Sequence, residues 1–115
     1  MEDRAGTVLV VEDDRSTRVF LADNLAADGY EPLEAETAEQ AQRLIETRFP
    51  DLVVMDLSLP DRDGLELIRE VREADRAAGR VDPDLPLLVL SGRAGELDRL
   101  RAFERGCDDY VTKPL

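Results

Sequence analysis

Four short stretches of this sequence carry side chains that could work together chemically. In chain order they are Glu12-Asp13-Asp14, Asp56, Ser91 and Lys113. Carboxylates that share a small space repel one another and raise each other's pKa values unless a cation lies between them. Magnesium suits such a site because it prefers oxygen ligands, usually one or two carboxylates together with waters and phosphate oxygens. The residue types therefore indicate acids around Mg²⁺, with a hydroxyl and an amine available to a phosphoryl group.

Most of these residues also have a plainer interpretation when they are taken singly. Asp14 could be the N-cap of the next helix, and Ser91 could be a turn residue at the end of a strand. Lys113 could be a solvated surface lysine, or it could form a structural ion pair with Asp56. Asp56 needs some partner, because it follows four apolar residues and a charge that leaves a buried strand is costly when it is unpaired.

The composition excludes several classes of function. The 115 residues include no histidine and one cysteine, Cys107, which rules out a serine–histidine triad, an imidazole or Cys-pair metal site and an internal disulfide. The 27 acidic and 15 basic residues give a net charge of −12, and the basic residues are scattered, which argues against direct contact with nucleic acid. No apolar run exceeds four residues, so we expect a cytoplasmic protein with neither a membrane span nor a secretory signal.

Strand and helix patterns alternate along the chain. Residues 8–11, 52–55 and 87–90 are continuous apolar runs, which are typical of strands buried on both faces. Residues 30–35 and 109–112 are weaker and predict edge strands. Four segments with helical spacing separate these strands. With right-handed crossovers, this order favours an α/β domain built on a doubly wound, five-stranded parallel sheet of strand order 2-1-3-4-5.

Local signals predict where the helices begin and end. Asp28-Gly29 ends the first helix, Thr37 caps the second, Ala78-Gly79 ends the third and Gly106 ends the fourth. The sequence stops at Leu115, shortly after the fifth strand, so we expect no fifth helix in this chain. The first helix would then cover one sheet face alone. We expect something to cover the bare part of that face, for instance self-association as a homodimer.

The strand order also places the candidate site. In an open parallel sheet, ligands bind beyond the carboxyl ends of the strands where the strand order reverses, here between the first and third strands. Each of the four reactive stretches leaves the carboxyl end of a strand, so we expect them to converge there. We also predict a cis Lys113–Pro114 bond, because a cis turn would aim the lysine back over the carboxylates.

Four motifs, taken in order, resemble the receiver domain of bacterial two-component response regulators, a flavodoxin-like fold of the chemotaxis-regulator type. They are Val-Leu-Val-Val-Glu-Asp-Asp at 8–14, Asp-Leu-Ser-Leu-Pro at 56–60 with Gly64, Leu-Ser-Gly at 90–92 and Tyr-Val-Thr-Lys-Pro at 110–114. The resemblance runs from the first strand to the last residue. It implies that residues 1–115 are one receiver domain of a bacterial phosphorelay, a phosphoprotein and not a turnover enzyme.

The resemblance further implies the roles of the acidic residues. Asp56 would be the phosphoacceptor, which receives a phosphoryl group from a sensor histidine kinase or a phosphotransfer protein. Glu12 and Asp13 would hold Mg²⁺, assisted by Asp56 itself and by the backbone carbonyl of Ser58. An aspartyl phosphate places charge on the phosphoryl oxygens, which metal, amine and hydroxyl together would compensate.

The same resemblance implies a switch. Ser91 would bind a phosphoryl oxygen, Lys113 would pair with the phosphoryl group, and Tyr110 would change rotamer as Ser91 moves inward. The surface around the fourth helix and fifth strand would report the change to an output, which we expect to be transcription. A plainer reading of Tyr110 is that it packs at the sheet edge.

This chain departs from the common receiver pattern in a few places. Glu12 stands where Asp is more usual, Ser91 where Thr is more usual, and Gly92 where Ala is more usual. The fifth helix that receivers normally carry is missing. That absence implies a C-terminally truncated receiver whose output domain lies outside the chain.

Three other functions compete with a phosphoacceptor domain. A phosphate-loop nucleotide hydrolase is excluded because the chain has no Gly-x-x-x-x-Gly-Lys-Ser/Thr motif. A phosphatase of the haloacid dehalogenase type would need a second Asp two residues after Asp56, where this chain has Ser58. A phosphorylation-independent interaction domain with a receiver fold usually lacks an acid, the acceptor or the lysine, all of which are present here, and it stays as the alternative.

Overall fold

Strands and helices alternate along the chain, and each strand and helix predicted from the sequence is present. The computed structural model describes residues 6–93 and 95–114. The strands are β1 (Thr7–Val11), β2 (Glu31–Ala35), β3 (Leu52–Met55), β4 (Leu87–Ser91) and β5 (Asp109–Thr112). The helices are α1 (Arg15–Ala27), α2 (Ala38–Arg48), α3 (Gly64–Arg72) and α4 (Glu96–Arg105), with one turn of 3-10 helix, η1 (Arg76–Ala78), before β4.

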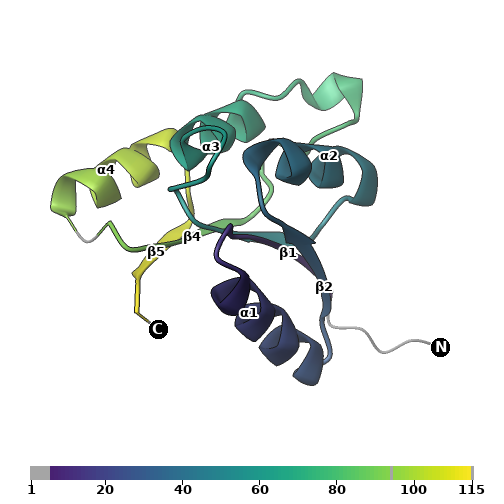
Figure 1. The fold of residues 1–115 in the computed structure, drawn as a ribbon. Coiled ribbons are helices and arrows are strands. Elements are labelled where there is room, and N and C mark those ends of the chain that lie inside the picture. The colour runs from purple at the N-terminus through teal and green to yellow at the C-terminus, as the bar shows by residue number, and fades with distance from the viewer. Residues whose placement is uncertain (1–5, 94, 115) are drawn as a thin grey trace.

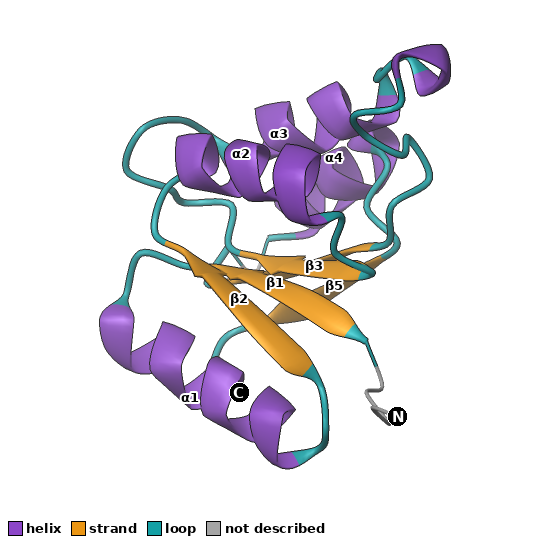
Figure 2. Cartoon of the chain, turned by 90° about the vertical axis from the view of Figure 1, so that its right-hand side faces the viewer, coloured by secondary structure: helices purple, strands orange, loops and turns teal. Residues whose placement is uncertain are grey.

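The five strands form one parallel sheet in the order β2-β1-β3-β4-β5, which confirms the predicted topology. Figure 1 shows α1 on one face of this sheet and α2, α3 and α4 on the other. The view along the sheet edge in Figure 2 shows the same three layers. The larger hydrophobic core lies between the sheet and α2–α4, where Leu9, Val53, Leu67 and Ile68 are almost completely buried. In the described part of the chain, no helix is long and apolar enough to cross a bilayer.

The α1 face of the sheet has a smaller core. Val8, Val54 and Leu90 are buried there, and Leu21 and Leu25 of α1 pack against them. The central strands of this face are therefore covered at Val8, Val54 and Leu90, so any bare patch lies outside these three residues. Beyond α1 the edge strand β5 carries Val111, which is 39% exposed.

Short polar side chains begin three of the helices. Asp14, Thr37 and Asp63 have extended backbones and accept hydrogen bonds from the N–H groups of Thr17, Gln40 and Leu65, respectively. Asp28 and Gly106 lie at the ends of α1 and α4, as predicted. The Lys113–Pro114 bond is cis, which confirms that prediction.

The predicted end of the third helix is wrong. Helix α3 ends at Arg72, and Ala78-Gly79 instead closes the separate turn η1. The reason is local: Asp75 has an extended backbone, and its carboxylate accepts a hydrogen bond from the Ala77 N–H. An Asp that bonds its own downstream backbone in this way favours a new cap over continuation of the helix.

Candidate functional site

Three carboxylates meet at the carboxyl ends of β1 and β3. Val11 and Met55 are register partners in these neighbouring strands, so the residues that follow them emerge side by side. Oxygen atoms of Glu12, Asp13 and Asp56 all lie within 4.8 Å of one another. Glu12 is 3% exposed and Asp56 is 8% exposed, whereas Asp13 faces solvent. The sequence-based expectation that these acids converge is therefore confirmed.

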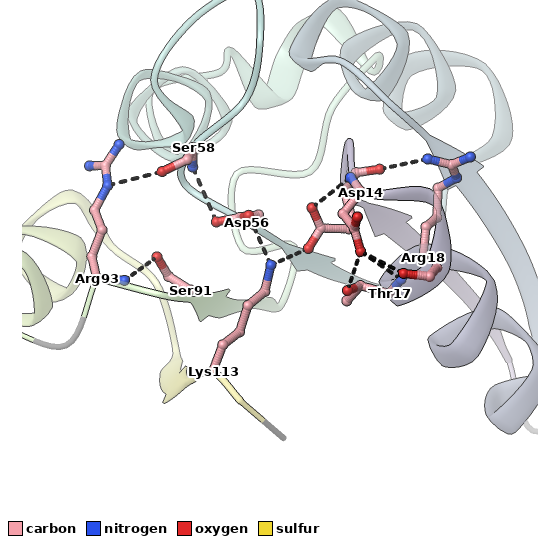
Figure 3. A network of polar contacts seen from close by, with 10 residues as sticks. Asp14, Thr17, Arg18, Asp56, Ser58, Ser91, Arg93 and Lys113 are labelled. Carbon is pink, nitrogen blue, oxygen red and sulfur yellow. Dashed lines mark hydrogen bonds and ion pairs between the residues drawn. The ribbon is translucent and has the colours of Figure 1, made fainter.

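Lys113 reaches this cluster from the loop after β5. Its ammonium donates to Oε1 of Glu12 and to Oδ2 of Asp56, the latter at 3.0 Å. Figure 3 shows the Lys113 side chain extending toward Asp56. Its backbone N–H also donates to the Ser91 carbonyl at 2.8 Å, which anchors the base of the side chain. The ion pair between Asp56 and Lys113 that the sequence suggested is therefore present, and it lies within the acidic cluster.

The cluster shifts the pKa values of two of its members. Burial raises the pKa of the Glu12 carboxyl above its ordinary value of 4.5, although hydrogen bonds from Lys113 and from the Asp14 N–H oppose the shift. Burial alone would lower the pKa of the Lys113 ammonium, but its hydrogen bonds to Glu12 and Asp56 outweigh that effect and raise the pKa above 10.5. Lys113 is therefore held firmly as a cation between two acids.

The raised pKa of Lys113 predicts how the chain responds to alkali. A lysine whose pKa is higher in the folded state adds stability that is fully present below its unfolded pKa and is lost as the pH rises through the folded pKa. Lys113 is the only lysine in the sequence, so selective isotope labelling of lysine gives one side-chain NMR signal. We expect that signal to titrate above pH 10.5 in the parent and closer to 10.5 in Asp56→Asn. Titration of the parent below 10.5 would contradict the ion pairs.

The donor set fits a divalent cation. Three carboxylates against one ammonium leave two negative charges, when all are ionised, at a partly buried point of the fold. Such a concentration of charge is costly unless a counterion shares it. Carboxylate oxygens at a mouth that water can reach suit Mg²⁺, which keeps several of its waters.

Asp14 acts as a helix N-cap and not as a member of the acidic cluster. Its carboxylate accepts from both the backbone N–H and the hydroxyl of Thr17, at 3.0 and 2.6 Å, and from the Ser16 hydroxyl. These hydrogen bonds, led by that of the Thr17 hydroxyl, lower the pKa of Asp14. Asp14 therefore caps α1, while Glu12 and Asp13 supply the acidic pair.

The hydroxyl residues at the far side of the cluster are joined through one loop. Ser91 is completely buried, and its Oγ accepts from the Arg93 N–H at 3.1 Å. The Tyr110 hydroxyl donates to the Arg93 carbonyl at 2.5 Å, and the ring is buried. The purely structural interpretations of both residues are thus partly correct. Ser91 forms a hydrogen bond in a turn at the end of a strand, and the Tyr110 ring packs into the core. The structure also connects the two predicted switch residues through Arg93.

The loop after β3 borders the site on its third side. The Ser58 N–H donates to Oδ1 of Asp56 at 3.1 Å, so both oxygens of this carboxylate are bound. Gly64 begins α3 directly behind Asp56, where an added Cβ would lie 2.9 Å from the Asp56 carbonyl and from Leu57 Cα. Only glycine fits this close approach without displacing the loop.

Two arginines at the site were not singled out in the sequence. Arg93 crosses to the β3–α3 loop, where it donates to the Ser58 hydroxyl at 3.3 Å (Figure 3). It also donates to the Asp63 carboxylate at 3.3 Å. Arg18 of α1 is 7% exposed and donates to the backbone carbonyl of Glu12 at 2.9 Å. Neither had a sequence signal, because arginines are frequent in this chain and nothing local distinguishes these two.

Comparison with known proteins agrees with this arrangement. A family model described as the response regulator receiver domain matches residues 8–115. The chain belongs to this family. The receiver domain is 42% identical, over 108 residues, to the KDP operon transcriptional regulatory protein KdpE of Escherichia coli K12. That alignment covers 94% of this chain and 44% of KdpE, so the chain spans less than half the length of this relative.

Experimental structures of receivers have the same fold. A response regulator from Chloroflexus aurantiacus superposes with a TM-score of 0.86 at 32% identity, covering 96% of this chain and 86% of that one. The non-phosphorylated HemR receiver domain from Leptospira biflexa gives 0.82 at 36% identity, covering 95% of this chain and 82% of that one. The receiver domain described here is therefore a phosphoacceptor domain of two-component signalling, built on the CheY-like fold.

Proposed function

We propose that Asp56 accepts a phosphoryl group from a histidine kinase or a phosphotransfer protein, in a reaction that requires Mg²⁺ bound by Glu12, Asp13, Asp56 and the backbone carbonyl of Ser58. The observation that carries this proposal is that one buried carboxylate accepts a hydrogen bond from the lysine ammonium at 3.0 Å and lies within 4.8 Å of the acidic pair. In this proposal Asp56 is the nucleophile, Lys113 is the cation for the transferred group, and the three acids form the metal-binding face.

The transfer is a displacement at phosphorus. A carboxylate oxygen of Asp56 forms a bond to phosphorus while the bond from phosphorus to the donor breaks, and the donor keeps the electron pair. Lys113 holds the carboxylate in place and offers positive charge to the phosphoryl oxygens. Bound Mg²⁺ would supply further charge compensation for those oxygens. Hydrolysis of the acyl phosphate by water returns the carboxylate and releases inorganic phosphate.

The domain acts as a signalling switch in this proposal, and catalytic turnover is not its task. Ser58 stands where a general acid would be needed for rapid hydrolysis, and a serine hydroxyl is a poor proton donor at neutral pH. Ser91 accepts from Arg93 and still has a hydroxyl proton to give to a phosphoryl oxygen. Movement of Ser91 would therefore act on the Arg93 loop and, through its carbonyl, on Tyr110.

The output and the partners follow from the same proposal. KdpE is named a transcriptional regulatory protein, and we propose control of transcription as the output to which this receiver contributes.

We also propose self-association as part of switching, supported by Leu97 and Leu100 of α4, which are 57% and 55% exposed. Light scattering before and after phosphorylation measures that state.

Phosphorylation should depend strictly on the divalent ion. We expect the chain, incubated with acetyl phosphate and Mg²⁺, to gain the mass of one phosphoryl group, and we expect EDTA to prevent the gain. The reason is that three crowded acids repel an anionic donor until a cation neutralises them. Intact-mass spectrometry measures the result. A chain that gains no phosphate from small donors or from any histidine kinase would instead support the phosphorylation-independent interaction domain.

A further inference from the structure

A buried arginine lies directly behind the acidic pair. Arg18, in the first turns of α1, is 7% exposed, and each arm of its guanidinium has a partner. Nη1 donates to the Glu12 carbonyl at 2.9 Å, Nε to Glu34 at 3.1 Å and Nη2 to Glu36 at 3.4 Å. Figure 3 shows Arg18 extending from α1 along the loop that carries Asp14. A guanidinium buried this far is costly unless its hydrogen bonds are made, so its position is well determined.

The main-chain contact of Arg18 acts on the peptide group that joins the two metal-binding acids. The Glu12 N–H donates to the Ala35 carbonyl at 2.9 Å, and the Glu12 carboxylate accepts from the Asp14 N–H at 3.1 Å. Arg18 binds the Glu12 carbonyl, which belongs to the peptide group between Glu12 and Asp13. The direction in which the exposed Asp13 side chain leaves the main chain therefore depends on a peptide group that Arg18 holds.

The charges around Arg18 are compatible with a cation site. An isolated guanidinium next to the acids would repel a metal ion. Glu34 and Glu36 lie on its other side and offset its charge, so Arg18 can hold the carbonyl without opposing cation binding. These contacts suit a residue that orients the metal ligands. They do not suit a residue that itself binds the metal or a phosphate.

We propose that Arg18 is a positioning residue for the Mg²⁺ site, which preorganises Glu12 and Asp13 by fixing the peptide group between them. The inference rests on the function proposed above, since it assigns Mg²⁺ to that site. Residues that orient metal ligands from behind typically change metal affinity by about 10- to 100-fold when they are replaced. Arg18 should accordingly affect the binding of Mg²⁺ more than the rate of transfer once Mg²⁺ is saturating.

The matched control is Arg62, a partly buried arginine that also has a carboxylate partner. In the described part of the chain its hydrogen-bond partners are Glu70 of α3 and Gln42 of α2, which lie outside the acidic loop of residues 12–14. Calorimetric titration of the full chain with Mg²⁺, together with thermal melting, compares Arg18→Gln with Arg62→Gln. We expect both variants to melt at lower temperature, whereas only Arg18→Gln raises the Kd for Mg²⁺, by about 10-fold.

The kinetics give a second readout. In Arg18→Gln, the Mg²⁺ concentration for half-maximal phosphorylation should rise with the Kd, while the rate at saturating Mg²⁺ stays near that of the parent. If Arg18→Gln does not fold, Arg18→Lys against Arg62→Lys makes the same comparison, because lysine cannot bond all three acceptors together. An unchanged Kd in the Arg18 variant, or an equal rise in the Arg62 variant, overturns the inference.

Measurements on the parent chain distinguish a failure of this inference from a failure of the proposed function. If the parent binds Mg²⁺ and is phosphorylated while the Arg18 variant keeps the parental Kd, the inference alone is wrong. If the parent itself neither binds Mg²⁺ nor accepts phosphate, the proposed function is wrong and the inference falls with it.

Discussion

Asp56→Asn is expected to abolish phosphorylation of this receiver domain. The amide lacks the anionic oxygen that would attack phosphorus. Asp56 is the acid that accepts hydrogen bonds from both the Lys113 ammonium and the Ser58 N–H, so we do not expect Glu12 or Asp13 to replace it. The measurement is intact-mass spectrometry after incubation with a small phosphodonor and Mg²⁺. We expect the parent to carry one acid-labile phosphoryl group and the variant to carry none.

Asp14→Asn is the matched control for that variant. Asp14 lies in the same acidic loop but caps α1, a task that asparagine performs equally well. This control should be phosphorylated like the parent and should melt at nearly the same temperature. An Asp56→Asn chain that gains the same phosphate as the parent would show that another residue is the acceptor.

Lys113→Met is expected to slow phosphorylation by about 100-fold, the usual size of effect when a preorganised electrostatic donor is removed. The methionine keeps the length of the side chain and removes the charge that binds both Glu12 and Asp56. Initial rates at saturating Mg²⁺ and a fixed donor concentration measure the loss. Lys113→Arg retains a cation and should be impaired less. A Lys113→Met rate equal to that of the parent would contradict the assigned role.

The same variant should also change how the domain responds to the metal. Without the ammonium, Glu12 and Asp56 face each other with no protein cation between them, which destabilises the folded state in the absence of Mg²⁺. Binding of Mg²⁺ to the folded state then relieves a larger repulsion than in the parent. We expect Mg²⁺ to raise the melting temperature of Lys113→Met more than that of the parent.

Local features of the sequence were sufficient for the sheet and for most of the site. Three runs of four apolar residues marked the central strands, and the alternation with helical segments led to the strand order. Parallel strands bring their carboxyl ends to one edge, so the sequence alone predicts that Glu12, Asp13, Asp56 and Lys113 lie together. Such predictions succeed because the position of a strand end follows from the strand order.

Other features were decided only by tertiary structure. The end of α3 depended on the backbone of Asp75, and the extent of the bare sheet face depended on how α1 shields Val54 and Leu90. Arg18 and Arg93 acquired their roles from partners that the fold brings to them: Glu34 and Glu36 from β2 and its following loop, and Ser58 and Asp63 from the loop after β3. A long flexible side chain has many possible partners in the unfolded chain. The packed fold selects among them, because a buried guanidinium must satisfy its hydrogen bonds wherever the neighbouring elements leave acceptors.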